Sequence, residues 1–158
     1  MKFVTHYIYK RKVIEYGKDI LRSDNMKRER YFIQHGKTSV LKHCFNVACI
    51  SLFIANKLNL EISEREIVRG ALLHDYFMYD WHEKTEEKRR HGFTHARRAL
   101  LNAKRDFIVS SVEEDIIVKH MFPLNIAFPK YRESVIVCIA DKICAVCETF
   151  GIFTVSEK

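Results

Sequence analysis

The chain has 158 residues and is 47% hydrophobic, which supplies apolar surface for the core of one domain rather than two. Its 5 Gly and 2 Pro are too few for the many tight turns of a β-sandwich or barrel, so the composition predicts an all-α fold. The net charge of +7 favours anionic partners, and no apolar run approaches the ~20 residues needed to cross a bilayer, so no membrane partner is expected.

The N-terminal stretch and the cysteines together favour a cytoplasmic protein. The first twenty residues mix charge with aromatics and have neither the apolar core nor the cleavage site of a signal peptide. An odd number of cysteines lies within apolar periodic segments, as expected of reduced thiols: Cys44, Cys49, Cys138, Cys144 and Cys147. We interpret the single Cys144-x-x-Cys147 pair as buried small side chains rather than as a zinc site.

Basic residues are concentrated at the N-terminus. Residues 1–30 hold nine Lys or Arg against four Asp or Glu, with Lys10-Arg11-Lys12 the densest cluster. Such a segment could attract an anionic partner or substrate. The simpler interpretation is a solvated helix face.

Apolar periodicity and caps define the expected helices of the first half. Residues 5–22 predict an amphipathic helix, and residues 25–33 a short second one. A Thr38 or Ser39 cap begins a long helix that ends near Leu60. Its expected buried stripe comprises Leu41, Phe45, Ala48, Leu52 and Ala55.

The second half predicts four more elements. A Ser63 to Glu66 capping box begins a helix whose last turn carries His74-Asp75. A charged loop over 83–90 precedes a helix over 91–105. Ser110 or Ser111, with Glu113 or Glu114, caps a helix over 112–121 that Pro123 ends. The last helix runs from about Arg132 to Phe150 and ends at Gly151.

Polar residues on these apolar helices indicate a site. Asp141 lies in a segment that otherwise looks fully buried, so its carboxylate needs a salt bridge, hydrogen-bond donors or a metal ion. His43, His74 and His120 also lie on apolar helices. One such histidine is usually a hydrogen-bonded core residue, but three of them with two aspartates form a mixed N/O set that suits Zn²⁺, Mn²⁺ or Fe.

The order His43, His74-Asp75, Asp141 resembles the HD superfamily of metal-dependent phosphohydrolases, and so do the segments "SVLKHCFNVA", "GALLHD" and "IADK". The resemblance covers roughly residues 38–150 and leaves the basic helices of 1–35 outside it, within one domain of 1–158. It implies an HD-domain helical bundle, with His43, His74, Asp75 and Asp141 as metal ligands.

Some members of that superfamily bind two metals and have two further histidines before the last Asp. "HGFTHARRAL" resembles the first of these segments, with His91 as the ligand, and His120 matches the second. Asp75 would then bridge the two ions. Gly92 stands where the pattern has Pro, so His95, four residues on along the same helix face, is the alternative to His91.

The resemblance implies a phosphohydrolase that cleaves a nucleotide or another small phosphorylated substrate, using one or two divalent ions (Mn, Fe, Zn or Ni, with Mg possible) to activate water. Asp75 would be a ligand and a proton acceptor. Candidate phosphate-binding cations are Lys84, Arg90 and Lys142, and the residues from Tyr79 to His82 could line a pocket. The chain lacks the Gly-Lys and Gly-Tyr-Pro motifs of the cyclic-dinucleotide-cleaving branch, so that substrate is not expected.

Two other functions remain open at this stage. Some HD-fold proteins carry a di-iron site with the same ligands and oxidise their substrates. Alternatively, the ligands could only hold the helices together while the basic segment binds nucleic acid, which no stacking-aromatic motif supports.

Overall fold

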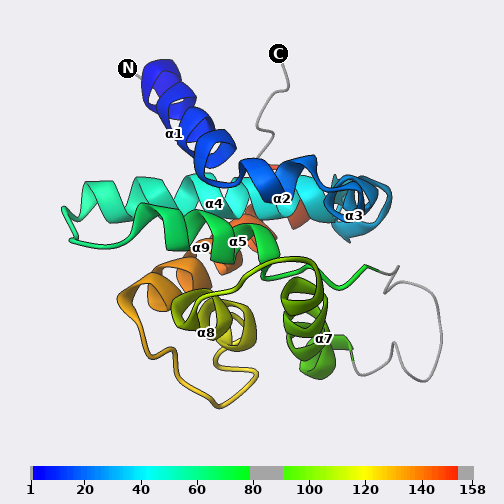
Figure 1. Cartoon of the computed structure of the whole chain (residues 1–158). Coiled ribbons are helices and arrows are strands. Elements are labelled where there is room, and N and C mark those ends of the chain that lie inside the picture. The colour runs from blue at the N-terminus through cyan, green and yellow to red at the C-terminus, as the bar shows by residue number, and fades with distance from the viewer. Residues whose placement is uncertain (1, 79–90, 153–158) are drawn as a thin grey trace.

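The computed structural model describes the backbone of residues 2–78 and 91–152, and the side chains of residues 8–78 and 94–152 (Figure 1). Helices dominate this part of the chain, which confirms the all-α prediction. In chain order the elements are α1 Lys2–Tyr16, α2 Lys18–Arg22, α3 Asp24–Arg28, the 3-10 turn η1 Glu29–Tyr31, β1 Ile33–His35, β2 Thr38–Ser39, α4 Val40–Lys57, α5 Glu64–Leu73, α7 His91–Asp106, α8 Ser111–Lys119 and α9 Arg132–Thr149.

The single helix predicted over 5–22 is wrong, because α1 ends at Tyr16 and α2 begins at Lys18. Gly17 lies at the break, where the backbone meets α5 closely. A Cβ at this position would lie 2.2 Å from Leu72 Cδ1, so only glycine fits without displacement. The break allows α1 and α2 to lie at an angle to each other along the same side of α4 (Figure 1).

The short helix predicted over 25–33 is also wrong in its second half, because α3 ends at Arg28, the 3-10 turn η1 spans Glu29–Tyr31 and a hairpin begins at Ile33. Strand β1 pairs antiparallel with β2 around Gly36, whose φ of +57° favours glycine. A Cβ on Gly36 would lie 2.7 Å from the carbonyl oxygen of Glu148, so the turn packs directly against α9. The hairpin therefore brings Gln34 and His35 of β1 next to the predicted site.

Helix α4 is the centre of the fold and packs against both α5 and α9. Its N-cap is Ser39, whose hydroxyl accepts the N–H of Lys42. The helix ends at Lys57, three residues before the predicted end. Of the predicted stripe, Ala48, Leu52 and Ala55 are buried, whereas Leu41 and Phe45 are only partly covered.

The capping box predicted at the start of α5 is only half formed. The Ser63 hydroxyl accepts the N–H of Glu66, but the Ser63 N–H donates to Glu133 of α9 at 3.0 Å. The Glu66 carboxylate accepts the Ser110 hydroxyl at 2.7 Å instead. Tertiary partners have replaced the local one, and they connect α5 to α8 and α9.

Helix α8 is held in place by a complete capping box and a buried ion pair. Ser110 and Glu113 form the box, which settles the predicted alternatives for this cap. Arg69 of α5 is buried and donates to Glu113 at 2.8 Å and to Asp19 of α2 at 2.6 Å. Removing one partner of a buried ion pair would leave the other charge unpaired, which is strongly destabilising. This network therefore fixes α8 against α5, and it also fixes the relative positions of the histidines at the ends of these helices.

Helix α9 follows its prediction closely, ending one residue before Phe150 and followed by Gly151 at a φ of +65°. Its Asp141 side chain is 11% exposed and contacts α4. Among the helices in the described part of the chain, none is both long enough and apolar enough to cross a membrane.

Candidate metal centre

His43 of α4 is held on both edges of its ring. Its Nδ1 donates to Glu148 Oε2 at 2.8 Å, and its Nε2 lies 3.0 Å from Asp141 Oδ1. Asn46, one turn along α4, donates to the other oxygen of Glu148 at 2.8 Å. This arrangement fixes the ring so that Nε2 points towards Asp141. In metal sites, a carboxylate bound to the other ring nitrogen orients a metal-binding histidine in the same way.

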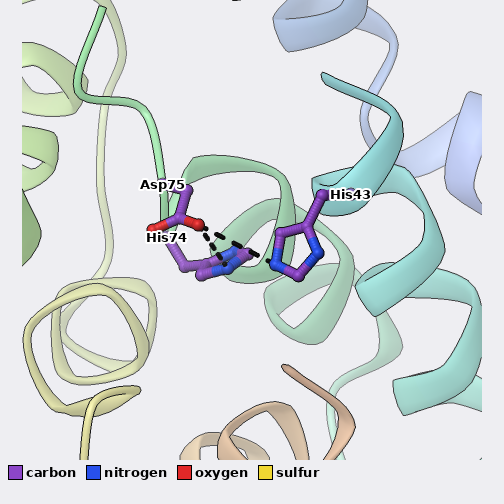
Figure 2. Close-up of side chains that lie close together, drawn as sticks. All are labelled: His43, His74 and Asp75. Carbon is purple, nitrogen blue, oxygen red and sulfur yellow. Dashed lines mark ion pairs between the residues drawn. The ribbon is translucent and has the colours of Figure 1, made fainter. Parts of the chain in front are cut away.

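His74 and Asp75 lie where α5 ends and the backbone turns. His74 is the C-cap residue, and its Nδ1 donates to the carbonyl of Ala71 at 2.7 Å, which directs Nε2 away from the helix. Asp75 follows with its carboxylate facing the rings of both His74 and His43 (Figure 2). Its Oδ2 lies 3.3 Å from His74 Nε2 and 3.8 Å from His43 Nε2.

The other oxygen of Asp75 faces a second pair of histidines. Oδ1 lies 3.3 Å from Nε2 of His95 on α7 and 3.5 Å from Nε2 of His120 at the end of α8. His120 Nδ1 donates to the carbonyl of Ile117 at 2.8 Å, so its Nε2 also points inward. The two Nε2 atoms are 2.9 Å apart. Asp75 is therefore placed between two groups of ligand atoms.

Burial and the neighbouring charges shift the pKa values of these carboxylates in opposite directions. Burial alone would raise the pKa of Asp75, but the positive charge of the adjacent His74 holds it well below its usual value. The pKa of Asp141 is likewise lowered, because the hydrogen bond from His43 and the positive charge of His74 outweigh burial. Both carboxylates are therefore ionised at neutral pH.

The pKa shifts of the histidines differ because their hydrogen-bond partners and neighbouring charges differ. Burial alone would lower the pKa of His43, but hydrogen bonds to Asp141 and Glu148 raise it to about 9. The pKa of His74 is raised well above 6.5, because the charge of Asp75 outweighs burial. Burial lowers the pKa of His120, which favours its neutral ring. A neutral ring is the form that binds a metal.

Two polar atoms of the cluster have no hydrogen-bond partner although they are buried: His74 Nε2 and Asp75 Oδ1. Such atoms are costly unless something else satisfies them. Imidazole nitrogens and carboxylate oxygens are ligands that divalent transition metals accept. Three overlapping groups have ligand atoms within 4.8 Å of one another: His43, His74 and Asp75; His74, His120 and Asp141; and Asp75, His95 and His120. The donor set fits a metal site.

This geometry agrees with the comparison of the sequence with known families. The family model of the HD domain matches residues 40–146, which is more than half of the chain. The chain belongs to the HD domain family. Searches of curated proteins and of solved structures gave no match.

HD domains belong to a superfamily of metal-dependent phosphohydrolases. The structure brings together five of the ligands predicted from the sequence: His43, His74, Asp75, His120 and Asp141. Their role as ligands stays a prediction. His91 begins α7, and its side chain lies outside the described residues. His95, the alternative, is buried within the cluster.

The predicted substrate-binding residues are placed only in part. Lys84, Arg90 and the segment 79–82 lie outside the described residues. Lys142 donates to the carbonyl oxygen of His120 at 2.7 Å and also contacts Cys138. These contacts connect the end of α8 to α9, and a role for Lys142 in substrate binding stays a prediction.

Sequence reasoning missed three supporting side chains. Glu148 lies seven residues after Asp141 on the same apolar helix, and this spacing could have revealed it. Asn46, three residues after His43, carried the same kind of signal. Gln34 of β1 is buried and its amide donates to Asp75 Oδ2, a contact across the fold for which the sequence offers no signal.

A fourth buried group anchors the chain just beyond the His-Asp pair. Glu29 of η1 is fully buried and accepts the N–H of Met78 at 2.8 Å. Burial raises the pKa of Glu29 to about 8, and the negative charge of Asp75 acts in the same direction. Met78 has a φ of +62°, which is uncommon for a residue with a side chain. The contact with Glu29 fixes the direction in which the chain leaves the site.

Proposed function

We propose that this HD domain is a phosphohydrolase that cleaves a phosphoester bond of a small phosphorylated substrate, with a nucleotide as the expected class. Family membership supports metal-dependent phosphoester chemistry. The observation that carries the proposal is the position of Asp75, whose two carboxylate oxygens face different groups of inward-pointing imidazole nitrogens. This position suits a bridging ligand between two ions.

In this proposal one ion would be held by His43, His74, Asp75 and Asp141. The other would be held by Asp75, His95 and His120, with His95 taking the place that the family pattern first gave to His91. The distances from Asp75 Oδ1 to the Nε2 atoms of His95 and His120 support this choice. When bound, divalent ions lower the pKa of a coordinated water and neutralise charge on the phosphoryl oxygens.

The residues of the chain have distinct tasks in this reaction. Asp75 is ionised at neutral pH, which its roles as ligand and as proton acceptor both require. A carboxylate with so low a pKa is a weak base, so the role as a ligand is the better supported of the two. Glu148, the Ala71 carbonyl and the Ile117 carbonyl fix three imidazole rings in advance, so that no reorientation is needed when an ion binds.

The test is phosphate release from a panel of nucleoside phosphates and p-nitrophenyl phosphate, with Mn²⁺ or Fe²⁺ supplied. Asp75→Asn and Asp141→Asn should each lower activity by more than about 100-fold, since even outer partners of metal ligands are worth about 10-fold to 100-fold. The exposed Glu61→Gln is the control and should keep full activity. Oxygen consumption without phosphate release would instead establish the oxidative di-iron alternative and overturn the proposal.

A further inference from the structure

A second feature of the molecule is a cavity of about 520 Å³ between α4 and the N-terminal elements α1, α2 and η1. Its volume is in the range of small-molecule sites. The polar lining residues are Lys10, Arg30, Ser39, Lys42 and Asn46. None of the six residues of the metal cluster lines this cavity, nor does Glu148. The cavity and the support of the metal centre share Asn46, which donates to Glu148 at 2.8 Å.

The charge of the cavity is positive. Lys10, Arg30 and Lys42 come from α1, η1 and α4, and none of the described lining residues is acidic. Arg30 uses its Nε–H to donate to the carbonyl of Lys27, which occupies one of the five N–H donors of the guanidinium. Arg30 and Lys42 on one concave surface produce a positive potential that favours an anion.

The first turn of α4 borders the cavity. Ser39 is the N-cap of this 18-residue helix and lines the cavity, while its hydroxyl accepts the N–H of Lys42 and the Val40 N–H donates to the carbonyl of Phe32. Asn46 lies further along the same helix, is buried, and contributes a polar side chain to the lining. Lysine and arginine together are typical of a phosphate-binding site.

The rest of the lining is apolar: Leu21, Leu41 and Phe45. Leu41 and Phe45 are the two residues of the predicted α4 stripe that the core leaves partly uncovered. An aromatic ring with aliphatic neighbours can hold a planar apolar group. The lining thus combines an anion-binding end with a surface for a flat ring.

We propose that this cavity binds a nucleoside monophosphate, with the phosphate at Arg30, Lys42 and the start of α4, and the base against Phe45. The cavity lies between α4 and the N-terminal helices. Of the nine basic residues of 1–30, Lys10 and Arg30 line it, which gives these two a role other than that of a solvated helix face. This binding site does not depend on phosphohydrolase activity at the metal centre.

The test is titration calorimetry of chelator-treated protein with adenosine monophosphate, adenosine and inorganic phosphate. Wild type should bind one adenosine monophosphate, and adenosine should bind at least about tenfold more weakly because it lacks the charged group. The double variant Arg30→Ala with Lys42→Ala should weaken adenosine monophosphate binding by about tenfold or more. The single variant Arg30→Glu, at an exposed position, provides the same test with little risk to folding.

The matched control is Lys57→Ala with Arg65→Ala, which removes the same charge from exposed positions outside the cavity and should bind as wild type does. Asp75→Asn should also keep its affinity, which separates this site from the metal centre. The proposal is overturned if wild type does not bind adenosine monophosphate, if both double variants lose affinity equally, or if Asp75→Asn abolishes binding.

Discussion

Glu148 Oε2 lies 2.8 Å from His43 Nδ1, on the opposite edge of the ring from Asp141. The Glu148 side chain is fully buried, and Asn46 holds its other oxygen. A buried carboxylate in this position keeps a proton on Nδ1 and directs Nε2 towards the candidate metal centre. Glu148 is therefore as much a part of the candidate centre as the ligands themselves.

Replacing this carboxylate by an amide tests that relationship. Glu148→Gln should weaken Mn²⁺ binding by about 10-fold to 100-fold, because the ring of His43 loses its charged partner while the volume of the side chain is kept. Competition with a metal indicator dye measures the affinity. Glu133→Gln on the same helix is the control, since Glu133 caps α5 and does not contact the cluster. Equal affinities in wild type and Glu148→Gln would contradict the role of Glu148.

Gln34 should act on Asp75 from the hairpin. Gln34→Ala removes a buried donor to Asp75 Oδ2, so the carboxylate loses one of the contacts that orient it. We expect Mn²⁺ affinity to fall by about tenfold, with helix content unchanged in circular dichroism. Lys37→Ala, at an exposed position of the same hairpin, should have no effect. If the two variants bind Mn²⁺ alike, the hairpin has no part in the centre.

His91 and His95 give opposite expectations for the second ion. His95→Ala should reduce the bound metal from two ions to one, because its Nε2 lies 3.3 Å from Oδ1 of Asp75, the proposed bridging ligand. His91→Ala should keep both ions. Elemental analysis of the two variants after dialysis distinguishes them. The reverse result would return His91 to the role that the family pattern suggested.

The metal-free chain should lose stability as the pH rises above neutrality. The pKa of His43 is raised from 6.5 to about 9, so its stabilising contribution is complete below pH 6.5 and is lost as the pH approaches 9. Glu29, with its pKa raised from 4.5 to about 8, acts in the same direction. The lowered pKa of His120 opposes this trend only around and below 6.5.

Thermal unfolding of chelator-treated protein at pH 7.0, 7.75 and 8.5 measures this trend. The Tm should fall steadily over the series. At its upper end the thiols of the unfolded chain add to the fall, since their pKa is about 8.5 whereas burial raises the pKa of Cys44 to about 11. A Tm that rises across the same range would show that the His43 ion pairs are not formed in the metal-free state.

Much of the centre could be predicted from the sequence, because each helix carries its own local signals. The caps at Ser39 and Ser110 and the glycine after α9 placed the ends of three helices well. The order of His43, His74-Asp75 and Asp141 then gave the family, and the structure brings these four side chains together. These features depend on interactions between residues that are close together in the chain, so they can be predicted from one sequence.

The remaining features depend on contacts between distant segments. His91 and His95 lie one turn apart on one helix, and only the packing of α7 against α8 brings His95 to His120. The hairpin of β1 and β2 is too short to show strand periodicity, so its contact with Asp75 could not be read from the sequence. Long-range contacts also changed the Ser63 cap, where Glu133 of α9 accepts the Ser63 N–H in place of Glu66.

The central claim is that Asp75 bridges two metal ions. The most direct measurement is the metal content per chain of protein purified without chelator and then loaded anaerobically with Mn²⁺ or Fe²⁺, with Asp75→Ala alongside. We predict two ions per chain in the wild type and none in the variant. One ion in the wild type would contradict the bridge, and none would contradict the metal centre as a whole.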